Sequence, residues 1–242
     1  MYPDFETFRE LAGQYNLIPV TRTFLADMET PIRVFRHFSD DPNCFLLESV
    51  EGGAKWARYS FIGTDPFLVV RGKAGTLMVE RADGGTEMYE AQPVDFLRNL
   101  LSQYRSPRYE GFPRFMGGAV GFFGYDLLRY YEKKLPSHRV DDLHMSDLQF
   151  MFCDRIIIFD HLKQQMMVAV NAHVPAGAGE EQLAEAYREA CRKIDALAAR
   201  LQEGSLRGGN DGIPRSPVRP VTLEAGEFRS NMTKDQFIAN VI

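Results

Sequence analysis

The residues that could do chemistry gather in one apolar stretch, 43-NCFLLESVEGGAKWARYSFIGTDPFLVV-70. It is typical of buried strands, yet polar residues interrupt it at close range: Glu48, Ser49, Lys55, Arg58, Tyr59 and Ser60. A carboxylate in a core is costly unless it is paired. In one interpretation Glu48 pairs internally with Arg58 and Ser49 caps the turn. In the other, the acid holds an ammonium and the hydroxyl and guanidinium hold a carboxylate, which makes a site for a zwitterion.

Outside this stretch the sequence has no recognisable catalytic motif. The run 117-GGAVGFFGYD-126 lacks the Lys and Ser/Thr of a phosphate-binding loop and the glycine spacing of a dinucleotide fingerprint. It predicts instead a strand that another backbone approaches closely. Two acidic residues, Asp154 and Asp160, are expected to be surface or strand-end groups, and so are His144 and Asp147.

Composition excludes several classes of protein. The 242 residues carry a net charge of −5 without a dense Lys/Arg stripe, so no nucleic-acid partner is expected. No apolar run is long enough to predict a membrane span. The three cysteines have no metal-binding or disulfide spacing, and the N-terminus does not resemble a signal peptide. The sequence therefore predicts a cytoplasmic protein without a metal site of its own.

The elements that must position the polar residues alternate between hairpins and helices. Helices are predicted at 4–12, with Asp4 as its N-cap, at 30–38, with Thr30 as its N-cap, and at 94–104 and 179–203. Strands separated by short Gly, Asp or Pro turns are predicted at 17–25, 44–50, 57–63, 66–72, 75–81, 85–90, 115–126, 148–160 and 164–172. This order predicts an α+β fold with a large antiparallel β-sheet or sandwich and flanking helices.

The C-terminal part suggests a division into domains. The helix at 179–203 has a core-facing apolar stripe and is expected to end at Gly204. A linker rich in Gly, Pro and Ser follows at 204–227. Residues 228–242 then begin a short helix capped by Thr233. The predicted division is 1–203, 204–227 and 228–242.

Three motifs carry a resemblance to a known family. FLLESVEGGAKWARYSFIGTDP, 116-MGGAVGFFGYDLLRYYEKKLP-136 and DLQFMFCD at 147–154 resemble the N-terminal region of the anthranilate synthase component I family. That family converts chorismate and ammonia from glutamine into anthranilate and pyruvate in tryptophan biosynthesis, as a carbon–oxygen lyase. The resemblance implies that residues 1–203 receive tryptophan as a feedback inhibitor. The ligand-binding residues it implies are Leu46, Leu47, Glu48 and Ser49, then Arg58, Tyr59 and Ser60, with Lys55 in the loop before them.

The resemblance also implies parts that this sequence lacks. Family members carry a chorismate-binding catalytic domain with a Mg²⁺ site, and 233–242 resembles only its start. The chain is therefore expected to be truncated, without catalytic residues or cofactors of its own, and inactive alone. The implied partners are that catalytic domain, a glutamine amidotransferase subunit and L-tryptophan. Two alternatives stay open: component I of para-aminobenzoate synthase, and a stand-alone amino-acid-sensing domain.

Overall fold

The computed structural model describes residues 1–26, 29–48, 58–132, 134, 141, 143–207 and 230–241. The chain divides into two compact units, Met1–Leu206 and Arg207–Ile242. The first unit holds both sheets and the predicted site.

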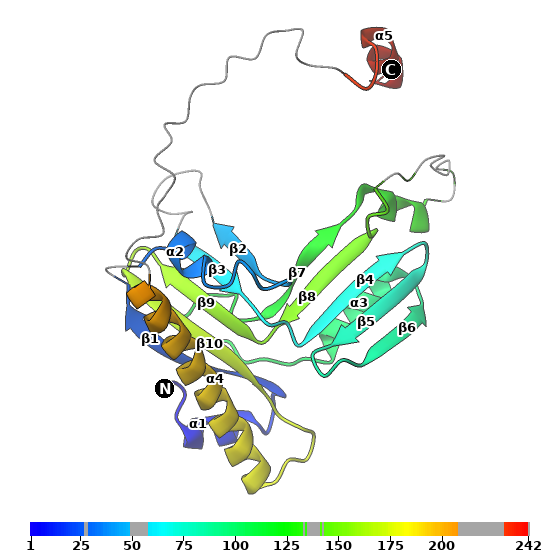
Figure 1. Ribbon diagram of the computed structural model, residues 1–242. Coiled ribbons are helices and arrows are strands. Elements are labelled where there is room, and N and C mark those ends of the chain that lie inside the picture. Colours follow the sequence, from blue (N-terminus) through cyan, green and yellow to red (C-terminus); the bar gives the residue numbers. More distant parts are fainter. Residues whose placement is uncertain are drawn as a thin grey trace. The chain divides into compact units, whose positions relative to one another are not determined.

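In the described part of the first unit, the strands form two five-stranded antiparallel sheets (Figure 1). The first has the order β1-β10-β9-β3-β2, with the bounds Leu17–Leu25, Gln165–His173, Arg155–Asp160, Tyr59–Gly63 and Phe45–Glu48. The second has the order β6-β5-β4-β8-β7, with the bounds Thr86–Glu90, Thr76–Arg81, Leu68–Lys73, Leu148–Cys153 and Gly118–Phe123. The predicted α+β class with antiparallel sheets is confirmed.

Local sequence signals explain the ends of several elements. Helices α1, α2 and α3, the 3₁₀ helix η1 and helix α4 span Phe5–Leu11, Pro31–Phe35, Pro93–Ser102, Tyr125–Tyr130 and Glu180–Arg207. Asp4 and Thr30 cap α1 and α2 as predicted, because each side-chain oxygen accepts a hydrogen bond from the backbone N–H three residues later. The predicted end of α4 at Gly204 is wrong. The helix continues to Arg207, since a glycine inside a helix costs only about 1 kcal/mol.

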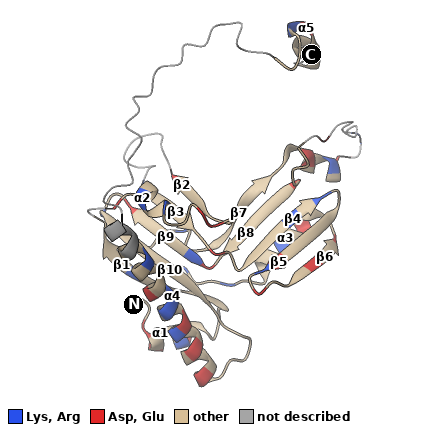
Figure 2. Ribbon diagram, in the orientation of Figure 1, with Lys and Arg blue, Asp and Glu red and all other residues tan. Residues whose placement is uncertain are grey.

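Helices α1, α2 and α4 cover one face of the first sheet. The apolar stripe of α4 packs there with α1, α2 and the strands, which confirms its predicted core-facing role. Charged residues line the rest of α4 (Figure 2). The stripe's buried members are Leu183, Ala190, Ile194, Leu197 and Leu201.

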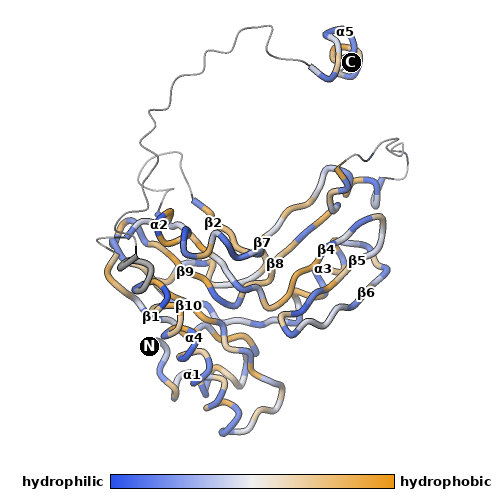
Figure 3. Tube along the Cα trace, viewed as in Figure 1, coloured by the Kyte–Doolittle hydropathy of each residue, from blue (hydrophilic) through white to orange (hydrophobic). Residues whose placement is uncertain are grey.

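The second sheet has its own core, and a third core joins the two sheets. Leu97 of α3 packs against β4, β5 and β8. The third cluster combines Phe45 and Ile158 of the first sheet with Cys153 of the second. Apolar residues therefore run along the central strands of both sheets (Figure 3).

The segment 148–160, predicted as one strand, is two strands in different sheets. The chain passes from β8 to β9 at Asp154, which is 2% exposed. Its Oδ2 lies 3.3 Å from Nζ of Lys193 on α4, and its Oδ1 lies 3.7 Å from Nε of Arg155. Asp154 was expected at the surface or at a strand end, and it does lie at the end of a strand. Its carboxylate is buried there because these two cations stabilise it in the interior.

The glycine-rich strand fulfils its structural prediction. A Cβ on Gly121 of β7 would lie 1.9 Å from the carbonyl oxygen of Gln149 and 2.7 Å from Cα of Phe150. Both atoms belong to the backbone of β8, the neighbouring strand. The glycine is therefore required by close approach of another backbone.

The second unit contains helix α5, Lys234–Val241. Its predicted cap is confirmed, since Oγ1 of Thr233 accepts a hydrogen bond from the N–H of Gln236 at 3.2 Å. Of the predicted linker 204–227, residues 204–207 belong to α4, and the others lie outside the described residues. Among the helices described, none combines the length and the apolar character needed to cross a membrane.

Candidate functional site

The predicted site residues lie on β2 and β3, at one edge of the first sheet. These strands are antiparallel, and Glu48 is directly opposite Ser60. Opposite residues of an antiparallel pair project from the same face of the sheet. The pairing register thus brings the carboxylate of Glu48 on β2 next to the hydroxyl of Ser60 on β3.

The pleat of the sheet divides the remaining predicted residues between two faces. Leu46 packs against the helix-covered core, so Glu48 and Ser60 share this face with it. Leu47 and Tyr59 belong to the opposite face, and Leu47 is 43% exposed. Ser49 and Lys55 lie outside the described residues. The predicted set does not line a single face of the strands.

Ser60 is buried, and its hydroxyl is hydrogen-bonded to a histidine. Its Oγ lies 2.7 Å from Nε2 of His161, the residue after β9. Strand β3 pairs directly with β9, and this pairing explains the contact between two residues about a hundred positions apart. The hydroxyl is therefore held in one orientation.

Arg58 forms a two-point ion pair with Asp160. Nε donates to Oδ1 at 3.1 Å, and Nη2 donates to Oδ2 at 2.8 Å. The guanidinium also lies over the ring of Tyr59, 4.8 Å from its centroid. The hydrogen bonds to Asp160 raise the pKa of Arg58. Burial raises the pKa of Asp160, but hydrogen bonds from Arg58 and from backbone N–H groups outweigh burial, and the net pKa is lowered.

Of the two interpretations, the one that pairs Glu48 internally with Arg58 is therefore wrong. Arg58 pairs with Asp160, and Ser60 bonds to His161. Asp160 and His161 could not be recognised as candidate site residues from the sequence, because only the pairing of β3 with β9 brings them next to Arg58 and Ser60. A cavity of about 400 Å³ lies against Asp160 and His161, bounded also by the start of α2.

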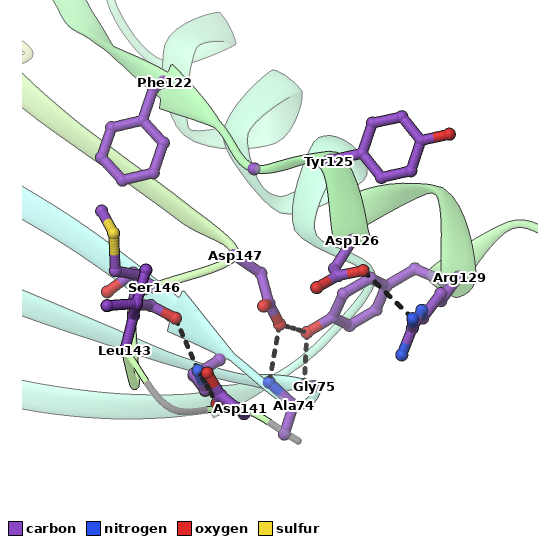
Figure 4. A pocket seen from close by; sticks show the side chains of 14 residues that line it. Ala74, Gly75, Phe122, Tyr125, Asp126, Arg129, Asp141, Leu143, Ser146 and Asp147 are labelled. Atoms are coloured by element: carbon purple, nitrogen blue, oxygen red, sulfur yellow. Dashed lines mark hydrogen bonds and ion pairs between the residues drawn. The ribbon is translucent and has the colours of Figure 1, made fainter. Parts of the chain in front are cut away.

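A larger cavity, of about 770 Å³, lies at the end of the second sheet (Figure 4). Asp147 Oδ2 accepts hydrogen bonds from the hydroxyl of Tyr130 at 2.6 Å and from the N–H of Ala74 at 2.9 Å. Burial and the bond to Asp147 raise the pKa of Tyr130 to about 12. Asp147 directly precedes β8, so it lies at a strand end, one of the two positions expected for it, and its carboxylate is a structural acceptor in a folded corner.

The other charges of this larger cavity are paired with one another. Lys73 forms an ion pair with Asp141, and Arg129 with Asp126 at 3.3 Å. Its lining also includes the aromatic rings of Phe122 and of the 85%-exposed Tyr125, which lie above the acids in Figure 4. The arrangement resembles neither a nucleophile with its base nor an acid–base pair. In the part of the chain that is described, no three His, Cys, Asp or Glu side chains are grouped to hold a metal ion.

Comparison with known proteins decides the family. A family model described as chorismate binding enzyme matches residues 42–241. The chain belongs to the chorismate binding enzyme family. Within it, the chain is 37% identical over 241 residues to anthranilate synthase component 1 of Acetivibrio thermocellus, covering 100% of this chain and 47% of that protein.

A second relative agrees. The chain is 34% identical to anthranilate synthase component 1 of Pseudomonas aeruginosa, over 96% of this chain and 45% of that protein. The crystal structure of anthranilate synthase component I from Streptococcus pneumoniae matches with a TM-score of 0.44 and 23% identity, over 71% of this chain and 36% of that one. The family model and the two sequence relatives confirm the resemblance predicted from the sequence. The chain spans about half the length of the curated relatives it matches.

Proposed function

We propose that this chain is the N-terminal part of an anthranilate synthase component I and that residues 1–203 form its tryptophan-binding regulatory domain. The longer enzyme would convert chorismate and ammonia from glutamine into anthranilate and pyruvate. Its catalytic domain, Mg²⁺ site and glutamine amidotransferase subunit lie outside this chain in the proposal. Residues 204–227 would link the two domains, and 228–242 would begin the catalytic one.

The observation that carries the regulatory proposal is the separation of Glu48 from Arg58. If the two charges formed their own ion pair, they would satisfy each other. Arg58 binds Asp160 instead, and no hydrogen bond or ion pair of the Glu48 side chain occurs among the described residues. A carboxylate at the end of β2 that has no partner among the described residues, and an anchored guanidinium just before β3, suit the ammonium and carboxylate of an amino acid.

The proposed site would act on catalysis by linkage. Tryptophan would favour the conformation that binds chorismate poorly, and chorismate would weaken tryptophan binding by the same factor. Because β2 is an edge strand, its open side is available to a wall supplied by a second domain.

Inhibition of the longer enzyme tests this proposal. Anthranilate formation is measured by its fluorescence against tryptophan concentration, for wild type and for Glu48→Ala. We expect Glu48→Ala to raise the half-inhibiting concentration at least about tenfold, which corresponds to the loss of one charge-assisted hydrogen bond. Glu90→Ala is the matched control, since Glu90 is also an exposed carboxylate at the last position of an edge strand. Equal inhibition of all three proteins contradicts the site.

The alternatives separate by other measurements. Formation of 4-amino-4-deoxychorismate in place of anthranilate would identify a para-aminobenzoate synthase component. A reading frame with no further domain would favour a stand-alone amino-acid sensor.

A further inference from the structure

Two consecutive residues, the last of β9 and the one after it, hold two polar residues at the start of β3: Arg58, just before the strand, and Ser60 within it. Asp160 binds the side chain of Arg58, and His161 binds the hydroxyl of Ser60. The N–H of His161 also donates to the carbonyl oxygen of Arg58 at 2.8 Å. This dipeptide therefore fixes the main chain of Arg58 and both polar side chains.

The carboxylate of Asp160 is itself fixed by the turn that follows β9. Its Oδ1 accepts hydrogen bonds from the N–H of Leu162 at 3.1 Å and of Lys163 at 3.2 Å. Side-chain-to-backbone bonds of this kind lock an aspartate in one orientation. Its side chain is 14% exposed, so solvent competes weakly for these bonds.

Asp160 occupies one edge of the Arg58 guanidinium and leaves the other open. The hydrogen bonds to Asp160 use Nε and Nη2, and Nη1 makes none within the described chain. A planar guanidinium can bind two carboxylates through two different edges. With Asp160 behind it, Arg58 presents its Nη1 edge to an incoming carboxylate without rotational freedom.

His161 gives Ser60 the same kind of support. Ser60 is 2% exposed, and its side chain lies on the same face of the sheet as Glu48. Because one hydrogen-bonding position of the hydroxyl is used by Nε2, its remaining hydrogen-bonding positions point away from the imidazole ring. His161 also borders the cavity of about 400 Å³.

We propose that Asp160 and His161 are positioning residues of the amino-acid site, holding Arg58 and Ser60 in the orientation that accepts the ligand. This inference rests on the proposed function. Neither residue contacts the ligand in this scheme, and both act through the β3 residues that they bind. The ligand class is an α-amino acid, recognised through its carboxylate on the Arg58 side of the site.

The experiment compares variants of the longer enzyme. Asp160→Asn keeps the size of the side chain but removes its charge, and His161→Leu removes the bond to Ser60. His161→Gln places an amide where Nε2 lies and retains that bond. We expect the first two variants to raise the half-inhibiting tryptophan concentration at least about tenfold. This rise should exceed any change in kcat or in KM for chorismate, and His161→Gln should restore inhibition to within about threefold of wild type.

The control and the outcomes distinguish this inference from the proposed function. Asp195→Asn breaks another ion pair of 2.8 Å, with Arg22 at the opposite edge of the same sheet, and should leave inhibition unchanged. If Glu48→Ala desensitises the enzyme but Asp160→Asn and His161→Leu do not, the positioning inference is overturned alone. If tryptophan does not inhibit the wild type, the proposed function fails. Should Asp160→Asn not fold, the comparison of His161→Leu with His161→Gln decides, and equal inhibition in both contradicts the inference.

Discussion

Arg155 and Asp65 join two of the segments by which the chain passes between its sheets. Nη1 of Arg155 lies 2.9 Å from Oδ2 of Asp65, which follows β3 and precedes β4. Nε of the same side chain faces Asp154, the residue between β8 and β9. A single guanidinium therefore links both crossings.

Arg155→Lys should destabilise the first unit. One ammonium cannot reach both carboxylates, so the buried Asp154 would lose a neighbouring cation. We expect a loss of about 1–2 kcal/mol in the free energy of unfolding, measured by urea denaturation. Arg22→Lys, at an exposed ion pair, should cost less than about 0.5 kcal/mol. Equal losses in the two variants would contradict the linking role.

Gly121→Ala should weaken the second sheet. The added methyl group would overlap backbone atoms of β8, which cannot move without breaking their pairing with β4 and β7. We expect a loss of about 3 kcal/mol or more in unfolding free energy. Gly13→Ala is the control, because its nearest atom is 3.4 Å away, at ordinary contact distance. A small effect at Gly121 would show that β7 shifts freely.

Local elements of this fold could be predicted well from sequence, because their signals are local. The caps at Asp4 and Thr30 and the stripe on α4 each depend on residues a few positions apart. The split at Asp154 could not be predicted this way, since its cation Lys193 lies 39 positions along the chain.

The candidate site divides in the same manner. Glu48 and Ser60 were predicted from neighbouring motifs, and the register pairs them. Asp160 and His161 were missed, because they approach β3 only through the pairing of distant strands. The interpretation that paired Glu48 with Arg58 relied on their nearness in sequence. The alternation of side chains along a strand and the pairing of strands decide instead which charged groups meet.

Acid should remove the contribution of the ion pair between Arg58 and Asp160. The pKa of Asp160 is lowered in the folded protein, so its contribution is present above the ordinary value of 3.8 and is lost as pH falls through the folded pKa. Wild type should therefore be more stable than Asp160→Asn at pH 6, and this difference should shrink toward pH 3. Urea midpoints at both pH values measure it. A difference that stays constant with pH would contradict the assignment.

Tryptophan should bind this 242-residue chain weakly or not at all. Under the proposed function, part of the wall of the site belongs to the catalytic domain, and the chain alone would offer only the β2–β3 side. Calorimetric titration measures the affinity, with Glu48→Ala as the reference for non-specific heat. Tight binding that Glu48→Ala abolishes would show that the site is complete within these residues.

The pairing of β1 with β10 has a consequence for biosynthesis. From Leu17↔His173 to Leu25↔Gln165, the first strand pairs with β10, its one strand partner among the described residues, in the last quarter of the first unit. A ribosome that releases residues 17–25 must add nearly all the rest of that unit before the pairing can form. The apolar segment 17–25 of the nascent chain therefore stays unpaired until residue 173 has been added. We expect chaperone binding to this segment, or the speed of translation through residue 173, to govern the yield of folded protein.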